Sequence, residues 1–380
     1  MNDTIKQQND FTGVTAWHNA GFTGKGVRVW NMEDRSDHGS GTRQRILDAA
    51  PDADVTSASH YLKFSNGVLL EEHVHASPMD LAADLFCQMN GFDIVTASLA
   101  GNQKSTEEAR RMLYGGLRRK YNLTMFNSAG NDGDEGVKGG RIPETEAIYT
   151  GACMAFKSNY DDLRMWNYSS IGDEEDEVDF STFTGGLNGT SFSTPYLAGI
   201  AALLMSRYGK MTSAEVYQYL KMIARPIPTG HPYKENYDLW SGYGVPILPD
   251  PKRKLVRMVI GSKTYMTDGQ ECQMDTAPFI KDSRTFVPIA FVAIALGAQV
   301  RWFPMEQRVS IIKDDRTVVM EIGKQFYTVW TGTHATTAKM DTAPFIKNSR
   351  TQVPLAFAGL ALGCKVAWVE SERKVMILEA

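Results

Sequence analysis

The sequence predicts an α/β protein in which a doubly wound parallel sheet is followed by a second, smaller α+β domain. Three observations carry this prediction. The chain has 380 residues, more than one hydrophobic core accommodates. Apolar strand-like runs alternate with helical patterns up to about residue 248, and a sequence repeat occupies the last third of the chain.

Five short apolar runs in the first part of the chain have the composition of buried strands. They lie at 27–30, 53–59, 92–99, 123–130 and 147–156, with helical patterns at 77–90 and 105–121 between some of them. Strands separated by helices predict a parallel sheet covered on both faces. In such a sheet, functional residues gather where the strands end at their carboxyl edges.

A change of composition marks the domain boundary. Residues 1–250 carry 22 Lys and Arg against 32 Asp and Glu, whereas residues 251–380 carry 18 against 12. Three prolines at 246, 249 and 251 accompany the change. We therefore expect a first domain at 1–248, a linker at 249–254 and a second domain at 255–380.

The second domain contains an internal duplication. Residues 274–312 recur as 340–378 with 23 of 39 positions identical. Each copy contains an extended T-x-V-P segment, a short apolar helix pattern and two short strands around a tryptophan, Trp302 or Trp368, which we expect in the core. The pattern predicts an α+β domain of two repeats, at about 255–312 and 319–378.

The composition excludes a membrane-spanning or disordered chain. Hydrophobic residues make up 43% of the sequence, and the longest apolar stretch, 196–205, is about half of what spans a bilayer. Four cysteines lie far apart, which predicts reduced thiols. The first ten residues are polar and lack the apolar core of a secretory signal. We expect a cytoplasmic or phage-associated protein, secreted only if the sequence has been trimmed.

Three short motifs bear the residue types of nucleophilic catalysis. Residues 189–205, GTSFSTPYLAGIAALLM, place Ser191 on a tight turn before a long apolar helix, where a hydroxyl is exposed and a backbone N–H points outward. A histidine motif, DHGSGT, occupies 37–42, and SAGNDG occupies 128–133. A serine at the start of a helix is by itself commonplace, so the specificity lies in the combination.

These motifs occur in an order that resembles the subtilisin-like serine proteases, or subtilases, over about residues 12–248. The resemblance implies a subtilisin-like fold, with Ser191 as nucleophile, His38 as general base and Asn131 as the side-chain donor to the oxyanion. The end of the strand at 92–99 resembles the family's substrate-binding segment. The substrate-binding residues implied are Ser98, Leu99, Ala100, Ser128, Ala129 and Gly130.

The acidic member of the triad departs from the family pattern. Aligned without gaps, the first strand places Glu33 where the family has Asp, with Asp34 one residue later. Because side chains alternate along a strand, only one of the two should face His38. We favour Glu33, while Asp34 or a degenerate triad stays open. Only four or five residues separate this acid from His38, which should alter substrate contacts.

No cofactor or metal ion is implied by the sequence. His73 and His75 lie beside Glu71 and Glu72, and the acidic run 173–177 could hold a structural Ca²⁺, but neither has the spacing of a defined site. The repeat at the end of the chain resembles the copper amine oxidase N-terminal domain, yet its only histidine is His334, so it has no copper ligand set. Its implied role is interaction or attachment.

The sequence therefore predicts a serine endopeptidase acting on protein or peptide substrates, with a C-terminal module that binds a bacterial surface or virion component. A pseudoprotease that binds a partner through the cleft is the alternative, and a third hypothesis makes the C-terminal module the main functional part. The basic charges of that module are dispersed, so we expect no nucleic-acid binding and no membrane binding.

Overall fold

The computed structural model describes residues 3–33, 36–58, 62–65, 68–71, 87–88, 90–98, 115–133, 147–172 and 177–379. The chain divides into two units, Met1–Pro251 and Lys252–Ala380. At the end of the first unit, the carbonyl oxygens of Pro249 and Pro251 accept hydrogen bonds from Trp17 Nε1 (2.7 Å) and Arg207 Nε (3.1 Å). Part of the segment expected as a linker is therefore held by the first unit.

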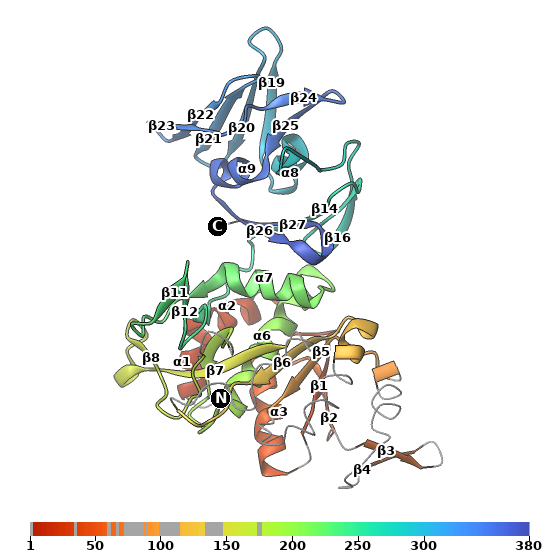
Figure 1. Cartoon of the computed structure of the whole chain (residues 1–380), viewed down its shortest axis with the longest axis vertical. Coiled ribbons are helices and arrows are strands. Elements are labelled where there is room, and N and C mark those ends of the chain that lie inside the picture. The colour runs from red at the N-terminus through yellow and green to blue at the C-terminus, as the bar shows by residue number, and fades with distance from the viewer. Residues whose placement is uncertain are drawn as a thin grey trace. The chain divides into compact units, whose positions relative to one another are not determined.

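The first unit is built on a seven-stranded sheet with the order β2-β1-β5-β6-β7-β8, in which β9 also pairs with β7 (Figure 1). All neighbours are parallel except β7 and β8. The predicted doubly wound α/β fold is thus present, with one antiparallel strand at the edge. The strands are β1 (Arg28–Asn31), β2 (Asp54–Ser57), β5 (Ile94–Ala97), β6 (Thr124–Ser128), β7 (Ile148–Ala155), β8 (Leu163–Met165) and β9 (Phe180–Phe183).

Helices and short strand pairs complete this unit. The helices are α1 (Asp3–Phe11), α2 (Val14–Asn19), α3 (Asp37–Ala49), α6 (Thr190–Tyr208) and α7 (Ser213–Ile223), with a 3-10 turn η2 (Phe156–Ser158). The short strands are β3 (Leu62–Ser65), β4 (Val68–Glu71), β10 (Ala224–Arg225), β11 (Pro232–Lys234), β12 (Tyr237–Asp238) and β13 (Val245–Pro246). No helix in the described ranges is long and apolar enough to cross a bilayer.

Helix α6 is buried on nearly all sides because its sequence is apolar throughout. It packs against α3 and against β5, β6 and β7. At Gly199 an added Cβ would lie only 2.6 Å from the Ile46 carbonyl oxygen and 2.8 Å from the Ala49 Cβ, both on α3. The glycine therefore permits a close approach of the two helices.

A buried polar network also joins α3 to α6 and α1. The Arg45 guanidinium of α3 lies 4.4 Å over the Tyr196 ring and donates to Asp48 (2.7 Å) and to the Phe183 carbonyl (3.0 Å). The Tyr196 hydroxyl in turn donates to Asn9 Oδ1 (2.8 Å). Burial lowers the pKa of Arg45, but the carboxylate and the ring keep the cation compensated.

The second unit is mostly β, with two short helices, α8 (Ile289–Ala295) and α9 (Leu355–Leu362), and a 3-10 turn η3 (Glu370–Glu372). Its sheets have the orders β16-β15-β14-β27-β26, β19-β20-β21-β22-β23 and β17-β18-β25-β24. The strands are β14 (Leu255–Val259), β15 (Thr264–Thr267), β16 (Gln270–Gln273), β17 (Phe279–Lys281), β18 (Arg284–Pro288), β19 (Gln299–Phe303), β20 (Arg308–Lys313), β21 (Arg316–Glu321), β22 (Phe326–Thr331), β23 (His334–Lys339), β24 (Phe345–Lys347), β25 (Arg350–Pro354), β26 (Cys364–Val369) and β27 (Lys374–Glu379).

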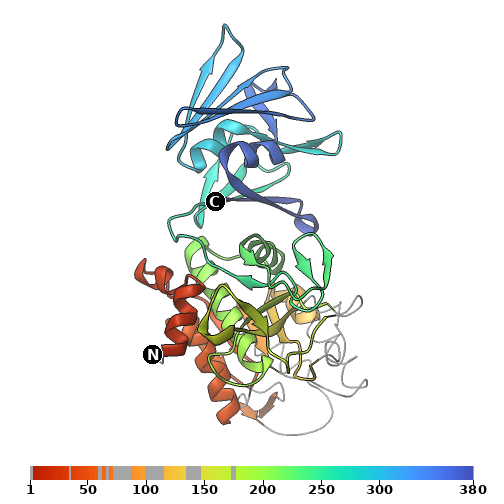
Figure 2. The ribbon, with the colours of Figure 1, turned by 90° about the vertical axis from the view of Figure 1, so that its left-hand side faces the viewer.

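Each sheet of this unit, drawn in teal to dark blue in Figure 2, joins a block of strands from one sequence repeat to a block from the other. The first strands of one repeat, β14 to β16, pair with the last strands of the other, β26 and β27, and β19 and β20 pair with β21 to β23 in the same way. In the central sheet Val287 pairs with Val353, its own counterpart 66 residues later. Each repeat therefore completes its sheets with strands of the other.

Contacts between side chains follow the same reciprocal pattern. Arg350 bonds Asp275, while Arg284 pairs with Asp341. Lys281 lies 5.1 Å over the Phe345 ring, and Lys347 lies 3.7 Å over the Phe279 ring. Among the two tryptophans expected in the core, Trp368 packs against it, whereas the expectation was wrong for Trp302, which is 41% exposed on the edge strand β19.

Candidate active site

The acidic residue comes two positions after the end of β1, and the histidine lies in the first turn of α3. The side chain of Ser36 caps the helix by accepting the Gly39 N–H at 3.3 Å, which places His38 in the first turn. Glu33 is 6% exposed, and its Oε2 lies 3.3 Å from His38 Nδ1. A carboxylate accepts the Nδ1 proton, so the neutral ring keeps Nε2 free to act as a base.

Asn31 fixes the position of this turn. The side chain lies on β1 and is fully buried, and its Nδ2, with two N–H groups, lies within hydrogen-bond distance of three acceptors: the Gly39 carbonyl (3.2 Å), Thr42 Oγ1 (3.1 Å) and Ser57 Oγ (3.1 Å). These contacts tie β1 to the first turn of α3 and to β2. The sequence analysis did not identify Asn31, although a lone polar residue inside an apolar strand was a signal that could have found it.

Ser191 is the second residue of α6, directly after the turn at Gly189, whose φ of 116° favours glycine. Pro195 lies four residues later in the helix and has no N–H to give to the Ser191 carbonyl. Ser98, at the end of β5, donates its hydroxyl to this carbonyl at 2.8 Å instead. The first turn of α6 is thus anchored to the end of β5.

Asn131 follows β6, and its side-chain oxygen accepts hydrogen bonds from Thr190. Oδ1 accepts the Thr190 N–H (2.8 Å) and the Thr190 hydroxyl (3.1 Å). Because these donors fix which amide atom is the oxygen, Nδ2 faces the other way as a donor. An added Cβ on Gly189 would lie 3.4 Å from Nδ2, so the glycine leaves room beside the amide. This arrangement suits an oxyanion donor.

The other predicted residues lie at the same edge of the sheet or outside the described residues. Ser128 ends β6, Ala129 is fully buried, and the Gly130 N–H donates to Thr190 Oγ1 at 3.2 Å. Ser98, Ser128 and Asn131 therefore follow neighbouring parallel strands, as Glu33 follows β1. Asp34, Leu99 and Ala100 lie outside the described residues.

The serine and the histidine lie near each other but do not share a hydrogen bond among the described residues. Ser191 Oγ donates to the Ser98 carbonyl at 3.4 Å. The His38 ring is 5.3 Å from the ring of Phe192, the residue after Ser191. An unliganded site commonly has longer catalytic contacts than its complex with substrate, so this hydrogen bond of Ser191 does not exclude a catalytic pair with His38.

The described residues contain neither disulfide bonds nor clusters of metal ligands. None of the four cysteines forms a disulfide bond, and burial raises the pKa of the Cys153 thiol and of the Cys364 thiol, the latter to about 11. In the described part of the chain no three His, Cys, Asp or Glu side chains cluster as metal ligands would. His73, His75 and residues 173–176 lie outside it.

Comparison with known proteins decides the family. The model of the subtilase family matches residues 38–245, more than half of the chain. The chain belongs to the subtilase family. In this subtilase the model of the copper amine oxidase N-terminal domain also matches, at residues 251–305 and 266–377.

Individual relatives of this subtilase are distant. It is 28% identical over 149 residues to subtilisin DY of Bacillus licheniformis, a match that covers 36% of this chain and 50% of subtilisin DY. The chain thus spans about half the length of that curated relative.

Solved structures similar to this subtilase include two of MycP1. MycP1 from the ESX-1 type VII secretion system has 18% identity and a TM-score of 0.47 over 64% of this chain and 87% of its own. MycP1 from Mycobacterium smegmatis has 17% identity and a TM-score of 0.46 over 64% and 85%. Sphericase has 16% identity and a TM-score of 0.45 over 60% and 93%.

Proposed function

We propose that this subtilase is a serine endopeptidase. The observation that carries the proposal is the buried Glu33 carboxylate 3.3 Å from His38 Nδ1, at the same sheet edge as Ser191 and an Asn131 amide held by Thr190. A carboxylate, an imidazole, a serine at a helix N-terminus and a side-chain amide are the parts that acyl transfer requires.

In the proposed reaction Ser191 Oγ attacks the carbonyl carbon of the scissile peptide bond while His38 Nε2 takes the hydroxyl proton. Glu33 stabilises the resulting imidazolium. Asn131 Nδ2 and the Ser191 N–H donate to the oxyanion of the tetrahedral intermediate. His38 then protonates the leaving amine, and water, deprotonated by His38, hydrolyses the acyl-enzyme and restores Ser191.

Hydrolysis of a chromogenic peptide by three variants tests this function. Ser191→Ala and His38→Ala should each abolish turnover, and the double variant should be hardly worse because the two residues act as one unit. Substantial turnover by Ser191→Ala would exclude the proposed nucleophile.

A second candidate function is peptide binding without catalysis. The observation that favours it is the Ser191 hydroxyl, which donates to the Ser98 carbonyl rather than to His38. A pseudoprotease of this kind would bind peptides that compete for the cleft but leave them intact. Wild-type protein that binds such peptides and shows no turnover above Ser191→Ala would favour this second candidate.

We further propose that the second unit serves binding or attachment rather than catalysis, with a bacterial surface or virion component as partner. Its excess of basic over acidic residues, 18 against 12 over 251–380, supports an acidic partner surface. Removal of the second unit should weaken retention on isolated bacterial envelopes or virions while peptide turnover persists. Equal retention without it would contradict this role.

A further inference from the structure

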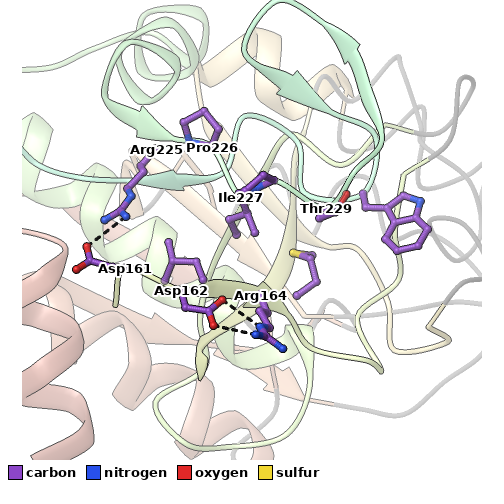
Figure 3. A pocket seen from close by; sticks show the side chains of 11 residues that line it. Asp161, Asp162, Arg164, Arg225, Pro226, Ile227 and Thr229 are labelled. Atoms are coloured by element: carbon purple, nitrogen blue, oxygen red, sulfur yellow. Dashed lines mark hydrogen bonds and ion pairs between the residues drawn. The ribbon is translucent and has the colours of Figure 1, made fainter. Parts of the chain in front are cut away.

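A groove runs along β8, the last strand of the seven-stranded sheet (Figure 3). It has a volume of about 590 Å³ and lies between residues 161–165 and residues 225–229, with Trp240 also on its wall. This volume is in the range of ordinary ligand pockets, about 300–1,000 Å³. None of the proposed catalytic residues, Glu33, His38, Asn131 and Ser191, lines this groove.

The register of β8 directs the backbone N–H and C=O groups of two of its residues away from β7. The strand is antiparallel to β7, Met165 pairs with Cys153, and the Trp166 N–H donates to the Ala152 carbonyl at 3.0 Å. In antiparallel pairs, residues that share ladder bonds alternate with residues that do not. Arg164 therefore bonds β7, whereas the N–H and C=O groups of Leu163 and Met165 face the open edge.

The opposite wall of the groove does not offer a matching strand. Pro226 and Pro228 have no N–H to donate, and Ile227 between them is 1% exposed in a small core that includes Leu163. An ion pair of 3.5 Å between Asp161 and Arg225 crosses from one wall to the other (Figure 3). Apolar packing and an ion pair thus connect the two walls. The outward backbone N–H and C=O groups of Leu163 and Met165 stay available for hydrogen bonds.

The charges of the groove are balanced within it. Asp162 accepts two hydrogen bonds from Arg164, at 3.0 and 2.8 Å, and Asp161 is paired with Arg225. Two carboxylates facing two guanidinium groups give no net attraction for an ionic ligand. The remaining lining is mostly apolar: Leu163, Met165, Pro226, Ile227, Pro228 and Trp240. The groove therefore suits an uncharged, mainly apolar occupant.

A short edge strand with a charged residue is also how proteins prevent unwanted strand pairing. Protection against unwanted pairing explains why β8 is short and carries Arg164, but it does not explain the groove beside the strand. A hollow next to outward backbone donors and acceptors is what an added strand requires. Backbone pairing would supply affinity, and alternate side chains would enter the apolar lining.

We propose that this groove binds an extended, uncharged segment of another polypeptide as an additional strand along β8. The segment pairs with the backbone of Leu163 and Met165 and directs alternate apolar side chains toward Ile227 and Trp240. The site is independent of the catalytic residues and adds a second place where a protein substrate or partner is held.

Binding of defined peptides to the full chain tests the proposal. The probes are N-acetylated, C-amidated nonapeptides that alternate Ser with Val, Leu or Phe, and the protein is Ser191→Ala, so that cleavage does not interfere whether or not the chain is a peptidase. At least one probe should bind in fluorescence anisotropy. Hydrogen exchange should then slow at least tenfold at the Leu163 and Met165 amides.

Met165→Pro removes an outward N–H without removing a ladder bond, because proline is tolerated where the N–H of an edge strand faces solvent. It should weaken binding at least tenfold, whereas the matched control Met165→Leu should not. Probes N-methylated at every second residue test the same bonds without altering the protein. Probes methylated on the residues whose N–H groups face β8 should lose binding, whereas probes methylated on the alternate residues should keep it.

Four outcomes would contradict the proposal. The first is that no probe binds at about 1 mM, in the range of very weak affinity. The second is that a probe binds but slows hydrogen exchange around residues 98 and 128–130 instead of at 163 and 165. The third is that the probes N-methylated in the two alternative registers bind equally. A dimer of the chain in sedimentation analysis that Met165→Pro dissociates would assign the edge to a second copy and would also contradict the proposed occupant.

Discussion

The contact between α3 and α6 at Gly199 makes a prediction about catalysis, because His38 lies on α3 and Ser191 on α6. In Gly199→Ala the new Cβ would be 2.6 Å from the Ile46 carbonyl oxygen and 2.8 Å from the Ala49 Cβ, where ordinary contacts begin at 3.4 Å. Since the Ile46 carbonyl is part of the helix backbone, it cannot rotate away. Helix α3 must shift by about 0.6–0.8 Å.

The size of the effect follows from this shift. Alanine gains about 1 kcal/mol of helix propensity over glycine, whereas overpacking costs about 1–3 kcal/mol. The free energy of unfolding should therefore fall by up to about 2 kcal/mol. A displacement near 1 Å of a catalytic group can cost about 100-fold in rate, so kcat should fall about 10- to 100-fold.

Gly116→Ala provides a matched control. Gly116 lies in the helical segment 115–121, and an added Cβ meets no atom of the described residues within 4 Å. This variant should gain about 0.5–1 kcal/mol of stability and keep the wild-type kcat. Initial rates on a chromogenic peptide and urea unfolding measure both quantities. Wild-type kcat and wild-type stability in Gly199→Ala would refute the argument that a close helix contact sets the spacing of the site.

Other variants separate the site residues by role. Glu33→Gln should lower kcat by up to about four orders of magnitude, because the histidine loses its orienting carboxylate, while Asp34→Asn should have little effect. The reverse ranking in steady-state kinetics would assign the role to Asp34. Asn131→Ala should lower kcat by about 10²–10³ with little change in KM, a magnitude known from subtilisin and not obtained from this structure, and a change in KM alone would make Asn131 a substrate contact. A chain ending at Pro251 should stay folded and keep its kcat/KM on short peptides, and insoluble or inactive protein would contradict the independence of the two units.

Much of the first unit could be predicted from the sequence because its central strands β5, β6 and β7 are mostly buried and largely apolar. All five predicted runs overlap a strand of the sheet, and four of them contain it whole. The motifs around Ser191 and Asn131 could also be found from the sequence. Each contains glycines where the backbone turns sharply, and this requirement makes the sequence of each motif distinctive. The sequence left the choice between Glu33 and Asp34 open, and in the structure Glu33 is the residue at His38 Nδ1.

Other features depend on contacts between distant segments and have no local pattern. Asn31 bonds residues up to 26 positions away, and Arg45 reaches the Phe183 carbonyl, 138 positions away. The pairing between strands of the two repeats is equally hidden, because a repeat in sequence does not say which strands pair. Strand β8 is only three residues long, too short for periodicity to indicate an edge or the groove beside it.

The central claim is that Ser191 is an activated nucleophile supported by His38 and Glu33. The most direct measurement is reaction of the purified protein with a fluorophosphonate probe, followed by peptide mapping of the adduct. The account predicts one adduct, on Ser191, and its loss in folded His38→Ala protein. Folded wild-type protein that stays unlabelled, or that is labelled on a residue other than Ser191, would contradict it.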